Sequence, residues 1–166
     1  MLSPEELGRL QREQHKHDMR NHLDIVSLHK ADRLKHYGLH FAKYVGRLAR
    51  GTDEAKSVEV TFVDALLVGL SAANTLLQDL SKEPGPRAAV TNQVDPLRSF
   101  ADAAGRFADA CEKIDHLEEF SSIAREANRD IIYWTIRAAH DRNFDIKTAI
   151  QSRRKVLGQR AFYIES

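Results

Sequence analysis

Residues 41–49 read FAKYVGRLA, and residues 100–108 read FADAAGRFA, so that five of the nine positions are identical. A second match follows each copy, because the pattern D-x7-AA-x5-DL beginning at Asp64 recurs as D-x7-AA-x5-DI beginning at Asp130. A repeat of about 60 residues is one supersecondary unit used twice. The sequence therefore predicts two stacked units with a shared interior, and such an interior is a natural place for a ligand site.

The rest of the chain favours an all-helical fold. Alternating runs of β-branched residues are absent, and turn-forming residues gather at Pro84-Gly85-Pro86. We expect one all-α domain over residues 1–166, a helical bundle of about six helices. The expected helices cover residues 4–18, 22–50, 61–80, 96–113, 116–142 and 146–157. The internal repeat is then approximately 22–80 and 97–146, with a connection at residues 81–95.

Three places have the residues of a helix start. Ser3-Pro4-Glu5-Glu6 combines an N-cap residue, proline at the first position and acids in the first turn. Asp95-Pro96 and Asp145 predict similar starts for the fourth and sixth helices. The helix expected at 61–80 is apolar almost all round, which indicates a buried core helix rather than a membrane span. It has one narrow polar stripe, formed by Asp64, Ser71, Thr75 and Gln78.

Composition and charge exclude several classes of protein. The chain has 166 residues, of which 42% are hydrophobic and 30% are charged, as in ordinary globular domains. A formal net charge of +1 provides no long-range attraction to nucleic acid or anionic membranes, so we expect neither as a partner. The single Cys111 cannot form an internal disulfide, and the N-terminus lacks a signal-peptide pattern. We therefore expect a cytoplasmic location.

One face of the helix expected at 22–50 gathers residues that could bind a ligand. Spacings of three and four residues place six side chains on this face: His29, Asp32, His36, His40, Lys43 and Arg47. Because histidines four residues apart can reach one metal ion, one interpretation is a Zn, Mn or Fe site made by His29, Asp32, His36 and His40. The other interpretations are a solvated face and a surface that lines a ligand site without metal.

Asp64 requires a partner, because burial of an isolated carboxylate costs several kcal/mol or more. The nearest candidates lie on the preceding helix, namely His40, Lys43 and Arg47. A second basic run, at residues 153–155, is interpreted as a solvated helix face. Gly46 and Gly105 hold equivalent places in the repeat, which predicts the same close helix contact in both halves.

Two segments together resemble the all-α MazG-like nucleoside triphosphate pyrophosphohydrolases, a group related to dimeric dUTPases. The first is LHFAKYVGRLA at residues 39–49, and the second begins with VDALL at Val63 and runs to Leu80. In that family, a Glu-Glu-x-x-Glu motif on one helix and a Glu-x-x-Asp motif on the next bind Mg²⁺, which holds the triphosphate while water attacks. The resemblance implies a bundle of two MazG-like hairpins that assembles further into a homodimer.

The metal-binding acids of that family are largely replaced in this chain. When the shared glycine is aligned, the glutamates of the first motif fall on Lys43, Tyr44 and Arg47. The glutamate of the second motif falls on Thr61, and only Asp64 remains. Mg²⁺ bound to phosphates requires carboxylate oxygens. Lysine and arginine in their place therefore predict that the usual hydrolysis does not take place.

The sequence supports three hypotheses for function. The first is a MazG-like protein with a degenerate metal site and no cofactor, which binds a nucleotide or another phosphorylated small molecule through basic side chains. Its expected ligand-binding residues are His36, His40, Lys43, Arg47 and Asp64. The second is a metal-dependent hydrolase or metal-binding protein that holds a divalent ion on the stripe from His29 to His40. The third is a non-catalytic structural or interaction protein.

Overall fold

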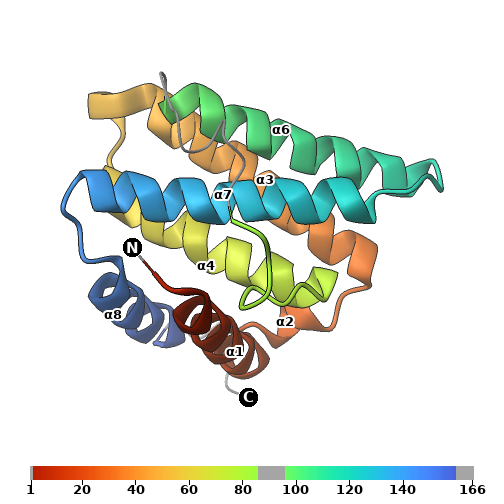
Figure 1. Cartoon of the computed structure of the whole chain (residues 1–166), viewed down its shortest axis with the longest axis horizontal. Helices are drawn as coiled ribbons and strands as arrows, with labels where there is room; N and C mark the ends of the chain where they lie inside the picture. The colour runs from red at the N-terminus through yellow and green to blue at the C-terminus, as the bar shows by residue number, and fades with distance from the viewer. Residues whose placement is uncertain (1, 86–95, 160–166) are drawn as a thin grey trace, which may run out of the picture.

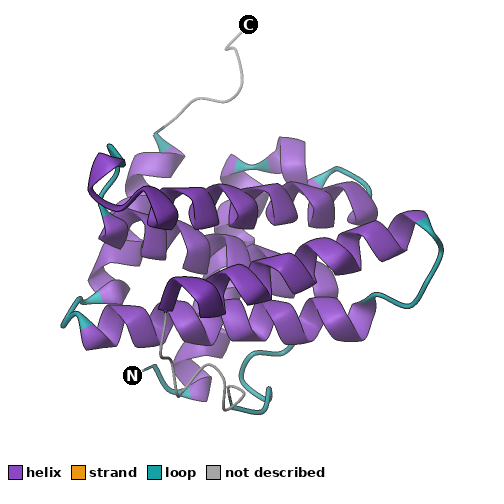
Figure 2. Cartoon of the chain, turned by 90° about the horizontal axis from the view of Figure 1, so that it is seen from above, coloured by secondary structure: helices purple, strands orange, loops and turns teal. Residues whose placement is uncertain are grey.

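The regular structure of the chain is helical throughout the part that the structure describes. The computed structural model describes residues 2–85 and 96–159 (Figure 2). Its helices are α1 (Pro4–Asn21), α2 (Leu23–Val26), α3 (Lys30–Arg50), the 3-10 turn η1 (Gly51–Asp53), α4 (Val58–Leu76), α6 (Pro96–Asp115), α7 (Ser121–Asp141) and α8 (Ile146–Gly158). The all-α bundle predicted from the sequence is confirmed.

Four long helices form the centre of the bundle. α3 packs on both α4 and α6, and α7 packs on the same two helices. α1 and α8 lie beside each other across the α4 side of this group (Figure 1), and both contact α4. α4 is consequently covered on most of its surface.

Aromatic side chains from both copies of the repeated stretch meet in the core. The rings of Phe41 and Phe107 pack edge to face with centroids 5.0 Å apart, and Phe100 packs on Trp134 at 4.6 Å. α4 is the one helix among the described residues that is long and apolar enough to cross a membrane, yet 72% of its apolar window is buried inside the bundle. α4 is therefore the core helix that its apolar pattern predicted.

The prediction of a single helix over residues 22–50 is wrong. The chain instead forms the short α2, and α3 begins only at Lys30. Between them, His29 has a non-helical backbone with φ −56° and ψ 147°, and its Nδ1 accepts a hydrogen bond from the Ala31 amide at 3.4 Å. His29 thus acts as the N-cap of α3, a role more often filled by a side-chain oxygen.

The predicted helix starts at Ser3 and Asp145 are confirmed. The Glu6 amide donates to the Ser3 hydroxyl, and the Ser3 amide donates to the Glu6 carboxylate, which together form a capping box. The Asp145 carboxylate accepts hydrogen bonds from the amides of Lys147 and Thr148. The predicted cap at Asp95 lies outside the described residues, as do residues 86–95 of the predicted connection.

α4 and α7 end in the same way. Leu77 and Asn143, which follow the two helices, both have a left-handed backbone, with φ of 56° and 52°. In each case the next amide donates to a carbonyl five residues earlier, that of Ala73 or Ala139, at 2.9 Å. This is the Schellman ending, and it stops α4 before residue 80, where the sequence placed the end. The two endings lie at matching places in the repeated D-x7-AA-x5-D pattern.

The prediction of a close helix contact at Gly46 and Gly105 is wrong. A Cβ atom at Gly46 would meet only the side chain of Arg50, and one at Gly105 would meet nothing within 4 Å. The tight contact lies instead between α4 and α7 at Gly69, where a Cβ would be 2.8 Å from Cγ1 of Ile132. The hydrophobic pattern did not distinguish Gly69 from its small neighbours.

We expect Gly69→Ala to lower the free energy of unfolding by about 1–3 kcal/mol, because the new methyl group would overlap Ile132 in a packed core. Gly105→Ala is the matched control. At this exposed position in α6 it should raise the free energy of unfolding by about 0.5–1 kcal/mol, since alanine favours a helix more than glycine does. Urea unfolding followed by circular dichroism measures both, and changes of the same sign would contradict this packing.

Candidate functional site

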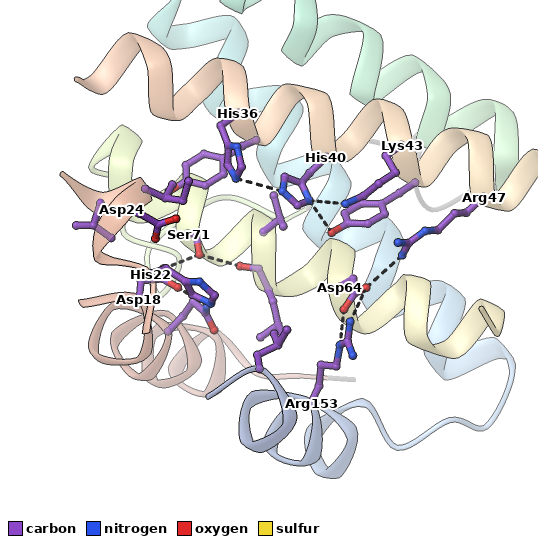
Figure 3. Close-up of a pocket in the computed structure, with 18 of the residues that line it drawn as sticks. Asp18, His22, Asp24, His36, His40, Lys43, Arg47, Asp64, Ser71 and Arg153 are labelled. Atoms are coloured by element: carbon purple, nitrogen blue, oxygen red, sulfur yellow. Dashed lines mark hydrogen bonds and ion pairs between the residues drawn. The ribbon is translucent and has the colours of Figure 1, made fainter. Parts of the chain in front are cut away.

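A cavity of about 350 Å³ lies between α3, α4, α8 and the corner where α1 meets α2 (Figure 3). This volume falls within the range of about 300–1,000 Å³ that is typical of small-molecule sites. Every residue of the expected ligand-binding set lines it: His36, His40, Lys43, Arg47 and Asp64. The cavity is also lined by Ser71, from the polar stripe of Asp64, and by residues that the sequence did not connect with this set, including Asp18, His22, Asp24 and Arg153.

Asp64 binds two arginines inside this cavity. Its Oδ2 accepts a hydrogen bond from Nη1 of Arg47 at 3.2 Å. Arg153 donates from Nε to Oδ1 at 2.7 Å and from Nη2 to Oδ2 at 3.1 Å. All three side chains are largely buried, with 9% of Asp64, 10% of Arg47 and 16% of Arg153 exposed. The Asp64 carboxylate therefore links α4 to both α3 and α8.

The prediction that residues 153–155 form a solvated face is wrong for Arg153 and Arg154. Arg154 donates to the side chains of Gln14 and Glu13 and to the Leu10 carbonyl, so it fastens α8 to α1. Arg153 is the second partner of Asp64. A signal for this was present in the sequence, since residues 146, 150, 153 and 157 share one helical face and three of them are apolar.

Histidines and basic residues of α3 form a hydrogen-bonded chain along the upper wall of the cavity in Figure 3. Nδ1 of His40 lies 3.0 Å from Nζ of Lys43 and 3.1 Å from the Tyr44 hydroxyl. Because an ammonium group has only donors, Nδ1 of His40 accepts and Nε2 carries the proton. Nε2 of His40 lies 3.1 Å from Nε2 of His36, to which it donates.

His36 and His40 are both neutral at pH 7. Burial, reinforced by the cationic Lys43, lowers the pKa of His40 to about 4. Burial also lowers the pKa of His36. The pKa of Lys43 is lowered by burial and then by the neighbouring Arg47. The positive charge at this end of the cavity thus comes from lysine and arginine rather than from histidine.

The opposite end of the cavity is acidic. Oδ2 of Asp18 accepts from the Ser71 hydroxyl at 2.6 Å, and Oδ1 accepts from Nε2 of Gln14 at 2.8 Å. Burial raises the pKa of Asp18, although these hydrogen bonds oppose the effect. Asp24 and His22 lie beside Asp18 in Figure 3, on the side away from Arg47 and Arg153. The cavity is therefore positive at one end and negative at the other.

The alternative metal site is divided between two places in the structure. His36 and His40 face each other in the cavity, whereas His29 caps α3 and Asp32 is exposed on the first turn of that helix. Within residues 2–85 and 96–159, no group of three or more His, Cys, Asp or Glu side chains is arranged to hold a metal ion. Two histidines are fewer than the three or four protein ligands of a zinc site.

The positions onto which the sequence resemblance would map the metal-binding acids of the MazG-like family do not fit Mg²⁺. Lys43 and Arg47 bring positive charge to two of them, and Tyr44 and Thr61 provide no carboxylate. The remaining acid, Asp64, already uses both oxygens to bind arginine. Mg²⁺ requires several oxygen ligands in near-octahedral geometry, and this arrangement cannot supply them.

Comparison with protein-family models, curated proteins and solved structures finds no match for this chain. The geometry and charge of the cavity are therefore the basis for assigning a function.

Asp64→Asn is expected to lower the free energy of unfolding by about 3 kcal/mol, because it leaves two largely buried arginines without their counter-charge. Asp102→Asn is the matched control, since its carboxylate also pairs with an arginine but is 58% exposed. We expect that substitution to change the free energy of unfolding by less than about 0.5 kcal/mol. Chemical denaturation measures both, and a small effect at Asp64 would show that the ion pairs contribute little to stability.

His40 should remain neutral at pH 5.5, where an unperturbed histidine with a pKa of about 6.5 is mostly protonated. Its folded-state pKa of about 4 lies below the unfolded value, so the unfolded state binds the additional proton between these values. The contribution of His40 to stability is thus complete above pH 6.5 and declines as the pH falls to 4. NMR titration of ¹⁵N-labelled imidazoles, with His40→Gln for assignment, measures this pKa and the Nε2–H tautomer. A His40 transition near pH 6.5 would be incompatible with the partly buried position of this imidazole.

Proposed function

We propose that the bundle consists of two MazG-like hairpins, α3–α4 and α6–α7. Two matching ion pairs support this. Arg47 on α3 binds Asp64 on α4, and Arg106 on α6 binds Asp130 on α7, with Nη2 2.7 Å from the carboxylate. Gly46 and Gly105 immediately precede the two arginines, so the pairs occupy the same positions in the repeated sequence. The matching ends of α4 and α7 support the same proposal.

We further propose that the cavity binds a nucleotide or another phosphorylated small molecule. The observation that carries this proposal is the excess of positive charge around Asp64. Four cationic side chains line that end of the cavity, namely Lys43, Arg47, Lys56 and Arg153. The single carboxylate of Asp64 neutralises one of these four charges, so the group has a net charge of about +3 and attracts an anion.

Ion pairing holds the two arginines in fixed positions. Each guanidinium has five N–H donors, of which Arg153 uses two and Arg47 uses one in binding Asp64. The remaining donors, together with the Lys43 ammonium, can form charge-assisted hydrogen bonds to phosphate oxygens. Because the carboxylate fixes the arginines beforehand, little side-chain entropy is lost when the anion binds.

In this proposal the ligand is bound without the usual pyrophosphohydrolysis. Arginine and lysine neutralise the phosphate charge directly, in the positions where the family places the acids that hold Mg²⁺. Asp64 is occupied by two guanidinium groups and is unsuited to serve as a general base. Affinity should accordingly not require a divalent cation.

Isothermal titration calorimetry with AMP and ATP in EDTA tests this proposal. We expect both nucleotides to bind, and Lys43→Gln to weaken binding about tenfold or more, since a hydrogen bond to a charged group contributes about 1.5–3 kcal/mol. Lys155→Gln is the control, because it removes the same charge from an exposed position of α8 outside the cavity. Absence of binding, binding only with added Mg²⁺, or equal effects of the two substitutions would contradict the proposal.

A further inference from the structure

We infer that the cavity selects phosphorylated ligands whose far end carries an amino group, such as nucleotides with an amino-substituted base. This inference rests on the proposed function and names the class of ligand. It depends on the two ends of one cavity having opposite charge. The basic end would hold the phosphate, and the acidic end would accept hydrogen bonds from the amino group.

Asp18 provides a fixed acceptor at the acidic end. Only 7% of the residue is exposed, and the Ser71 hydroxyl and the Gln14 amide hold its two oxygens in place. A carboxylate has about four lone-pair sites, so two accepted hydrogen bonds leave capacity for a ligand donor. Ser71 lies two helical turns from Asp64 on α4. The same helix therefore sets the spacing between the two ends.

Asp24 adds a second carboxylate from α2. It lines the cavity near His36, and its negative charge acts on that histidine. Its side chain is exposed to solvent, unlike that of Asp18. Asp18 and Asp24 thus approach the acidic end from different helices, and Figure 3 shows them on the same side of the cavity.

Part of the cavity lining is apolar or uncharged. Leu67 and Val68 of α4, Ile25 of α2 and Leu157 of α8 contribute apolar side chains to its lining. The neutral rings of His36 and His40 form the adjacent wall. A flat heterocycle fits such a lining better than a second charged group does, because burial of a charge without a partner is unfavourable.

These features favour amino bases over keto bases. An exocyclic amino group has two N–H donors and can donate to both carboxylates. A keto group at the same ring position would instead place an acceptor oxygen against two carboxylates, which cannot donate a hydrogen bond to it. The cavity should therefore prefer adenine to hypoxanthine and cytosine to uracil.

Calorimetric titration with two matched pairs of nucleotides, AMP with IMP and CMP with UMP, tests the inference in EDTA. Wild-type protein is expected to bind AMP and CMP at least tenfold more tightly than IMP and UMP. Asp24→Asn should reduce this ratio, because an asparagine amide can also donate to a keto oxygen. Asp18→Asn tests the buried carboxylate in the same way, after circular dichroism has confirmed that it is folded. Asp109→Asn, at an exposed position of α6, is the control and should leave the ratio unchanged.

The outcomes separate this inference from the proposed function. Equal affinity for amino and keto nucleotides in the wild type would overturn the selectivity and leave the proposed function intact. A ratio that is unchanged in Asp24→Asn and in every folded Asp18→Asn sample would overturn the role of the acidic end. If no nucleotide binds, the proposed function fails and the inference fails with it.

Discussion

The ion pairs of Asp64 with Arg47 and Arg153 are the interaction on which the arrangement of the cavity depends. They join α4 to α3 on one side and to α8 on the other. α8 buries two apolar residues, Ile146 and Ile150, and packs Ala149 and Leu157 partly against the core, so its polar contacts supplement a short apolar face. The bidentate contact of Arg153, together with the contacts of Arg154 with α1, fixes this helix as a wall of the cavity. Charges that are this well buried are stable only as a complete set.

The same ion pairs determine the electrostatics of the site. One carboxylate between two arginines leaves a net positive charge, and the nearby Lys43 and Lys56 increase it. His36 and His40 add nothing to that charge at pH 7, because burial keeps them neutral. The hydrogen-bonded chain from Lys43 through His40 to His36 then orients each ring. At the other end of the cavity, the uncharged side chains of Ser71 and Gln14 donate to Asp18 and hold its carboxylate in place.

Sequence reasoning identified the α3 part of this site but not the contributions of α8 and α1. The spacing of His36, His40, Lys43 and Arg47 was sufficient to place them on one face, since residues three and four apart on a helix are neighbours. The need of Asp64 for a partner was also evident from its apolar surroundings. Arg153 was interpreted as solvated, because a run of three basic residues near a helix end usually is. Its role depends on how α8 crosses α4, and no local pattern specifies that crossing.

The sequence by itself determined the helical content, the apolar character of α4, the caps at Ser3 and Asp145, and the set of side chains on α3. These features follow from interactions among residues close together in the chain, and such interactions leave a periodic signal. Only the tertiary structure decided the interruption before α3, the close contact at Gly69 and the second partner of Asp64. Asp64 and Arg153 are 89 residues apart, and their contact arises from the packing of whole helices. That packing minimises the free energy of the entire core, so the positions of individual charges follow from it.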